Sequence, residues 1–162
     1  MNAASVRGLV PDETEALLWA PWRMLETDHQ SFMTELRDLE GMLKKHRTNG
    51  CYPAPVINRL GRFVRHFESH MSSHFKAEET AVFPYLRRHA PRLSESLLFL
   101  IAEHRIIQRA LTDWKRSVNK SITGAKPNAT GTPLFLKGLE LVRLLRLHVE
   151  RENRIMRQFP SQ

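Results

Sequence analysis

The sequence predicts an all-α protein in which four long helices form an up-down-up-down bundle, preceded by a short N-terminal arm. Apolar residues recur at intervals of three and four over long stretches, which is the period of an amphipathic helix. Prolines and glycines fall mostly between these stretches, and the short or moderate connections favour antiparallel neighbours. The 162 residues are enough for one domain with its own core. We expect the arm over residues 1–21 and the helical domain over residues 22–160.

The arm has no periodicity over its first ten residues. Asp12 and Glu15 form a possible capping box for a short helical turn, which Pro21 is expected to interrupt. The first long helix then runs from about residue 22 to residue 47. His29 takes one place in its apolar series, whose other members are Leu25, Phe32, Leu36, Leu39 and Leu43.

The second helix is expected over residues 56–88, after a turn-rich loop that reads T-N-G-C-Y-P-A-P, with bends near Gly61 and Pro84. Its apolar face carries His70, His74 and Glu78, each four residues from the next. An unpaired imidazole or carboxylate on a buried face costs several kcal/mol. A metal ion would satisfy these groups if other segments supplied more ligands.

The third and fourth helices place further ligand-type residues in their apolar stripes. The third begins at Ser94, a plausible N-cap, and carries His104 in its stripe, whereas Glu103 is expected to face solvent. A polar linker over residues 119–132 follows, with Thr132 as N-cap and Pro133 as the first helical residue. The stripe of the fourth helix contains His148 and Glu152, the same spacing as His74 and Glu78.

In an up-down-up-down bundle these residues reach the same level along the axis. The predicted metal ligands are therefore His29, His74, Glu78, His104, His148 and Glu152. His70 is a possible additional ligand, because it lies one turn from His74 on the same face; otherwise it is a supporting or core residue. His46, His66 and His89 are predicted to be surface or structural residues.

Four imidazoles and two carboxylates suit iron, manganese or zinc better than calcium or magnesium. Six protein ligands exceed the tetrahedral shell of one zinc ion. Two metal ions bridged by both glutamates would take two histidines each. This arrangement would leave positions open for a diatomic ligand, peroxide, water or an oxo bridge.

Charge and composition narrow the remaining possibilities. The formal charge is +8, but the basic residues are scattered and no nucleic-acid-binding motif accompanies them, which argues against a nucleic-acid partner. The single Cys51 excludes an internal disulfide and a cysteine metal cluster, and fits a reducing compartment. With no apolar run near 18 residues and no signal pattern, we expect a cytoplasmic protein that does not associate with membranes. No protein partner is indicated.

Four stretches, in order, resemble the hemerythrin-like HHE cation-binding family. The most specific reads S-H-F-K-A-E-E-T-A-V-F-P, and the others are L-E-T-D-H-Q-S-F, A-E-H-R-I-I and L-H-V-E-R-E-N. The resemblance spans residues 21–159 and implies a hemerythrin-like four-helix bundle around a non-haem pair of iron ions with an oxo or hydroxo bridge. It implies that the four histidines are terminal ligands and that Glu78 and Glu152 are bridges, with Glu79 as a supporting or surface residue. Manganese or zinc remains possible.

One departure from the family concerns a fifth histidine. Oxygen-carrying hemerythrins have two histidines four apart on the third helix, but here Gln108 stands four residues after His104 and Leu100 four before it. The asymmetric iron pair of the carriers is therefore not implied for this chain. His70 could restore a fifth nitrogen from another helix.

Three functions remain open at the level of sequence. The first is a binding, sensing or iron-handling protein whose iron pair takes up oxygen, nitric oxide or peroxide. The second is an enzyme, a ferroxidase or peroxidase, for which Tyr85 is the one obvious redox-active side chain near the site. The third is a metal-free, basic helical interaction module. Whether the protein is an enzyme is left open.

Overall fold

A computed structural model describes residues 13–45, 52–123 and 131–158, with side chains of the first range from Thr27 onward. Residues 1–12 of the expected arm, residues 46–51 with His46 and Cys51, and residues 124–130 of the expected linker lie outside this description. The described elements are all helical. They are α1 (Glu13–Lys45), α2 (Ala54–Ala77), the π-helix η1 (Glu78–Val82), α3 (Phe83–His89), the 3₁₀ turn η2 (Pro91–Leu93), α4 (Ser94–Thr123) and α5 (Gly131–Met156).

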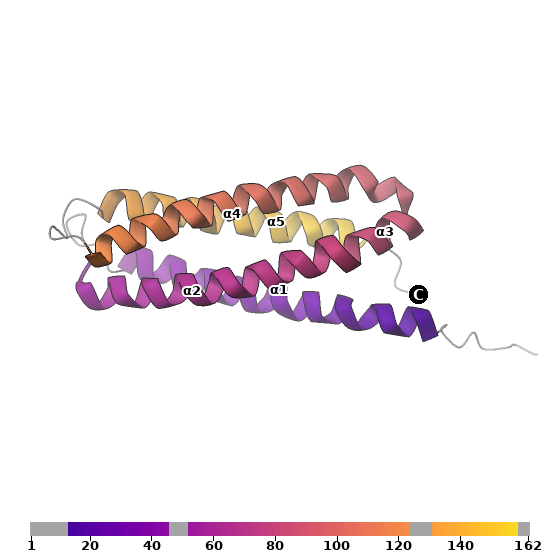
Figure 1. The fold of residues 1–162 in the computed structure, drawn as a ribbon, viewed down its shortest axis with the longest axis horizontal. Helices are drawn as coiled ribbons and strands as arrows, with labels where there is room; N and C mark the ends of the chain where they lie inside the picture. Colours follow the sequence, from indigo (N-terminus) through magenta and orange to yellow (C-terminus); the bar gives the residue numbers. More distant parts are fainter. Residues whose placement is uncertain (1–12, 46–51, 124–130, 159–162) are drawn as a thin grey trace, which may run out of the picture.

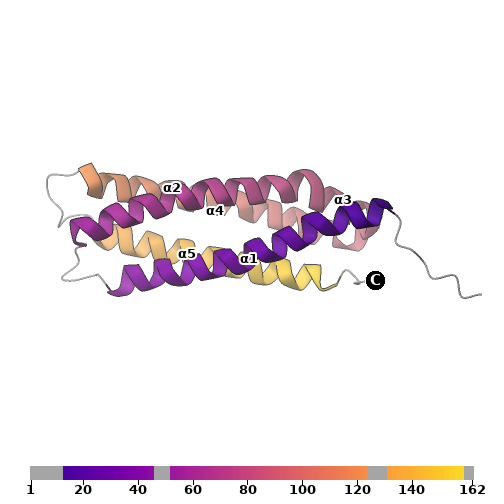
Figure 2. The ribbon, with the colours of Figure 1, turned by 90° about the horizontal axis from the view of Figure 1, so that it is seen from below.

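Four long helices lie side by side, and each runs antiparallel to the next along the chain (Figures 1 and 2). α1 packs against α2 and α5, and α4 packs against the same two helices from the opposite corner. The ring order is therefore α1, α2, α4, α5, which confirms the predicted bundle. Among the described helices, none is both long and apolar enough to cross a membrane.

The helices differ from the prediction at several positions. α5 begins at Gly131, so Thr132 lies inside the helix and the prediction that it caps the helix before Pro133 is wrong. α1 begins at Glu13 and continues through Pro21, so the expected interruption there is wrong. Gly61 lies within α2, which the structure assigns as one helix, and a β-carbon at Gly61 would come within 2.9 Å of Ile122. α4 continues to Thr123, into the segment expected to be linker. The boundary between arm and domain at residue 21 stays a prediction.

A π-helical segment, η1, replaces the bend that was expected near Pro84. The amide of Phe83 donates to the carbonyl of Glu78, five residues back. Pro84 has no amide hydrogen for the next bond of an α-helix, so the regular pattern cannot pass through it unchanged. The widened turn begins at Glu78, one of the predicted ligands, and π-helical turns are frequent at functional sites.

The apolar core is divided into two clusters with a polar layer between them. On α4, Leu100 belongs to the smaller cluster and Ile107 to the larger one, and His104 lies between them. On α5, Leu145 of the larger cluster and Met156 of the smaller one flank His148 and Glu152 in the same way. Hydrocarbon therefore closes the polar layer from both ends of the bundle.

Two helical glycines should respond to alanine in opposite directions. A β-carbon at Gly138 would lie 2.6 Å from Leu43 Cδ1 and 3.0 Å from Trp114 Nε1, whereas one at Gly41 would meet nothing within 4 Å. We expect Gly41→Ala to stabilise the fold by about 0.5–1 kcal/mol, because alanine favours helix. Overpacking costs about 1–3 kcal/mol and should outweigh that gain in Gly138→Ala. Urea unfolding of both variants checks this, and a more stable Gly138→Ala protein would contradict the packing at Trp114.

Candidate metal centre

The structure brings all six predicted ligand residues together between the two apolar clusters. All six residues are buried, with a relative exposure of at most 6% per residue. They form two groups of possible metal-binding atoms that share one residue. The first group is His29 from α1, His74 from α2, Glu78 from η1 and Glu152 from α5; the second is Glu78 with His104 from α4 and His148 from α5.

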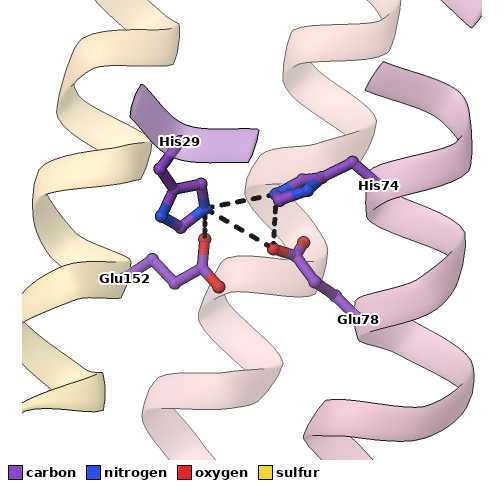
Figure 3. Close-up of side chains that lie close together, drawn as sticks. All are labelled: His29, His74, Glu78 and Glu152. Carbon is purple, nitrogen blue, oxygen red and sulfur yellow. Dashed lines mark hydrogen bonds and ion pairs between the residues drawn. The ribbon is translucent and has the colours of Figure 1, made fainter. Parts of the chain in front are cut away.

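In the first group the side chains point toward one another from three sides (Figure 3). The Nε2 atoms of His29 and His74 are 3.2 Å apart. Glu152 Oε2 lies 3.0 Å from His29 Nε2, and Glu78 Oε1 lies 2.7 Å from His74 Nε2. Two ligands bound at about 2.1 Å to a tetrahedral ion would be roughly 3.4 Å apart. The 3.2 and 3.0 Å spacings come close to this value, and the 2.7 Å spacing between Glu78 and His74 is shorter.

Glu78 directs its two oxygens toward different histidines. Oε1 faces His74 Nε2, whereas Oε2 lies 3.1 Å from His104 Nε2. Glu152 is less evenly placed, since its Oε2 is close to His29 and 3.8 Å from His148 Nε2. Of the two carboxylates that were expected to bridge, Glu78 is the one that belongs to both groups of possible ligands.

The donor set fits bound metal because its inward-facing atoms lack other partners. Both oxygens of Glu78 and of Glu152, and the Nε2 atoms of His104 and His148, are buried without a hydrogen-bond partner. Each such group costs about 1–3 kcal/mol if it stays unsatisfied. Cations bound by these oxygens and nitrogens would meet that need.

Each ligand histidine is held from behind through its Nδ1 atom. The partner always comes from the adjacent helix in the ring, and it stands next in sequence to a ligand of that helix. This orientation leaves Nε2 free to face the centre, as in many metal sites. The contacts are Asp28 Oδ2 with His74 at 3.2 Å, Glu79 Oε1 with His104 at 2.7 Å, Glu103 Oε2 with His148 at 3.3 Å and Asn153 Oδ1 with His29 at 3.2 Å.

The expectation that Glu103 faces solvent is wrong. Its side chain is 12% exposed and contacts both His148 and Arg151. The helical wheel alone placed it outside the apolar stripe, but α5 packs closely enough for its carboxylate to reach the next helix. Asp28 and Asn153 were not singled out from the sequence either. The one signal in the sequence was that Asp28 precedes His29 and Asn153 follows Glu152.

His70 does not belong to either buried group of possible ligands. It lies 3.6 Å from Asp28, through Nε2, and 3.6 Å from Glu35, through Nδ1, with its ring against Phe32 at 4.4 Å. His70 is therefore linked to the centre indirectly, through Asp28, which contacts Nδ1 of His74. Gln108, in the place of the carriers' extra histidine, is exposed.

Aromatic rings close the sides of the centre. Phe75 stacks on His104 with ring centroids 3.8 Å apart and an interplanar angle of 8°. Phe32 meets His74 edge to face at 5.0 Å, and Phe83 lies 5.8 Å from His104. These rings restrict both water and the rotation of the imidazoles.

Burial and the nearby carboxylates have opposite effects on the pKa values of the histidines. Burial alone would lower the pKa of His29, but its contacts with Glu152 and Glu78 raise that pKa to about 10. Burial lowers the pKa of His148 to about 4. Burial opposes ionisation of Glu78, yet the histidines that contact it hold its pKa well below the usual range. Burial and the charge of Glu78 raise the pKa of Glu152.

Metal affinity is expected to rise with pH between 6.5 and 8.5. Because the pKa of His29 is raised to about 10 without metal, His29 carries a proton over this range, and a metal ion must displace it. One displaced proton gives about a tenfold gain in affinity per pH unit. Zinc competition with a chelating dye, corrected for the pH dependence of the dye, would measure it. A constant affinity would contradict a protonated His29.

Fold and site together define a helical-bundle protein whose buried polar layer holds residues that could bind metal cations. A comparison with protein families matches residues 20–159 to the hemerythrin HHE cation binding domain. The chain belongs to this family, as its four sequence stretches indicated. A search of curated proteins and a search of solved structures gave no match.

Proposed function

We propose that this chain binds a pair of iron ions between its six buried ligand residues and takes up a small ligand there. Glu78 would bridge the two ions. His29, His74 and Glu152 would complete one position, and His104 and His148 the other. Bound iron supplies a reversible change of oxidation state and open positions for oxygen, nitric oxide or peroxide.

The burial of the six residues supports the proposal that the ligand is small. The six residues are at most 6% exposed, and Phe32, Phe75 and Phe83 pack against two of the imidazoles. A ligand of a few atoms fits such a site better than a larger substrate does. The uneven groups, four residues against three, also leave the His104 side with fewer protein ligands.

The protein groups around the centre have defined tasks in this proposal. The Nδ1 contacts fix each imidazole so that Nε2 faces inward, and they hold the tautomer that leaves Nε2 as the ligand atom. The phenylalanines exclude bulk water. Burial and the charge of Glu78 raise the pKa of Glu152 in the absence of metal, and a cation bound beside His29 would favour the ionised carboxylate.

The test is a visible spectrum of the protein loaded anaerobically with ferrous iron, before and after oxygen, nitric oxide or peroxide is added. We expect one stoichiometric spectral change with at least one of these ligands and its loss in Glu78→Ala. No change with any ligand would contradict the proposal. Continuous peroxide consumption that depends on Glu78 would favour the enzyme instead. Iron uptake without any ligand response would favour iron storage.

A further inference from the structure

A second group of metal-binding side chains lies outside the buried centre, between α1 and α2. Glu35 of α1 faces His66 and His70, which are one turn apart on α2, and their possible ligand atoms all lie within 4.8 Å of one another. We propose that these three residues bind one divalent transition-metal ion near the surface. This site is separate from the buried pair and does not depend on it.

The distances suit a metal better than hydrogen bonds. His66 Nε2 is 3.7 Å and His70 Nδ1 is 3.6 Å from the same oxygen of Glu35, Oε1. Both separations are too long for a hydrogen bond. They are close to the roughly 3.4 Å expected between two ligands that share a tetrahedral ion.

Two atoms of this group are buried and unsatisfied. His70 Nδ1 and Glu35 Oε2 have no hydrogen-bond partner, whereas Glu35 Oε1, the oxygen that lies 3.6 Å from His70 and 3.7 Å from His66, accepts a hydrogen bond from Ser31 Oγ at 3.4 Å. The other nitrogen of His70 points to Asp28 Oδ1 at 3.6 Å, and its ring is held against Phe32. With Nε2 turned to a carboxylate, His70 presents Nδ1 toward Glu35. Unlike the Nδ1 contacts of the buried histidines, the 3.6 Å separation from Asp28 is longer than a hydrogen bond, so the ring of His70 is positioned mainly by its contact with Phe32.

The site is open to solvent on the His66 side. The side chain of His66 is 71% exposed, whereas those of Glu35 and His70 are 20% and 27% exposed. A hollow of about 390 Å³ beside it is lined by Glu35 and His66 together with Asp38, Arg59 and Arg62. An ion can therefore reach these ligands without unfolding of the bundle.

The chemistry of the ligands sets the class of ion. The two arginines in the hollow balance Glu35 and Asp38, so charge alone does not attract a cation. Two imidazoles one turn apart are instead a chelate for ions such as zinc, cobalt or nickel. Calcium and magnesium prefer oxygen ligands and should not compete.

Calorimetric titration of the full chain with Zn²⁺ tests this site. We expect His66→Ala and Glu35→Gln to bind one zinc ion fewer per chain than the wild type, or to bind it about tenfold more weakly. His89→Ala is the matched control, because His89 is another exposed histidine whose Nδ1 contacts the carbonyl oxygen of Tyr85, and it should leave the titration unchanged. Millimolar Mg²⁺ should not displace the ion.

The expected difference of one zinc ion between the wild type and these variants does not depend on whether the buried centre binds metal. A negative result for the surface site would therefore leave the proposal for the buried centre untouched, and the reverse also holds. Equal numbers and affinities of zinc ions in the wild type and in His66→Ala would overturn the surface site. Displacement of the ion by Mg²⁺ would overturn its selectivity. Loss of the ion in His89→Ala would also overturn it, because that residue is outside the group.

Discussion

Glu78→Gln is expected to hold at most one metal ion among the six buried residues, instead of two. Glu78 is the one residue that belongs to both groups, with Oε1 toward His74 and Oε2 toward His104. Glutamine keeps the shape but replaces one carboxylate oxygen with an NH₂ group, which donates and cannot bind a cation. The His104 and His148 pair is then left with two ligands. Metal content of the purified, iron-loaded variant measures the change.

Glu79→Ala is the control for Glu78→Gln. The two glutamates are neighbours in the same π-helical segment, but Glu79 contacts only the outer nitrogen of His104, and its side chain is 37% exposed. Loss of such a partner weakens metal binding about 10–100-fold without removing a ligand. Two ions bound in Glu78→Gln, or a lower ion count at saturation in Glu79→Ala, would contradict the assignment of roles.

Removal of metal is expected to lower the melting temperature strongly. Without metal the buried carboxylates of Glu78 and Glu152 face only the neighbouring ligand-type histidines, among which His29 must hold a proton to pair with Glu152. Metal at a thousandfold excess over its dissociation constant stabilises the folded chain by about 4 kcal/mol. For a protein of this size that corresponds to roughly 8–16 °C. Calorimetric scans with and without a chelator measure the shift.

Metal bound at the surface site could also change the melting temperature, so variants of the two sites must be compared. His66→Ala should keep most of the metal-dependent shift, because His66 is not among the six buried residues. His148→Ala should lose most of it. Equal melting temperatures with and without metal would contradict a metal centre and would favour the third function, a metal-free helical module.

The period of the apolar residues was enough to predict the bundle and to place the six proposed ligand residues in one layer. Each ligand occupies a stripe position that would otherwise hold hydrocarbon, as His104 does between Leu100 and Ile107. Helix periodicity reports such positions directly. Up-down-up-down topology then sets their common level along the axis.

The supporting residues were harder to predict because they depend on contacts between helices. Asp28 and Glu103 lie outside the apolar stripes of their own helices. Helix periodicity alone would therefore predict that both side chains face solvent. Each reaches a histidine of the next helix, His74 and His148 respectively. Stripe position does not report how closely two helices approach.

The π-helical segment was also outside the reach of periodicity. The sequence indicated a bend near Pro84, and the missing amide of that proline is the physical cause of an irregular turn. What the pattern did not predict is that the extra residue is absorbed at Glu78–Val82, where it begins at a ligand. Several backbone geometries can precede a proline. In the π-helical geometry found here, Val82 and Phe83 pack into the smaller apolar cluster.

Anomalous diffraction at the iron edge, from crystals of the iron-loaded protein, would locate the two ions that Glu78 is proposed to bridge. We expect two peaks among the six buried residues, about 3.5–4 Å apart. One peak should lie beside His29, His74 and Glu152, and the other beside His104 and His148, with an oxygen of Glu78 facing each. A single peak, or no peak, among these residues would contradict the account.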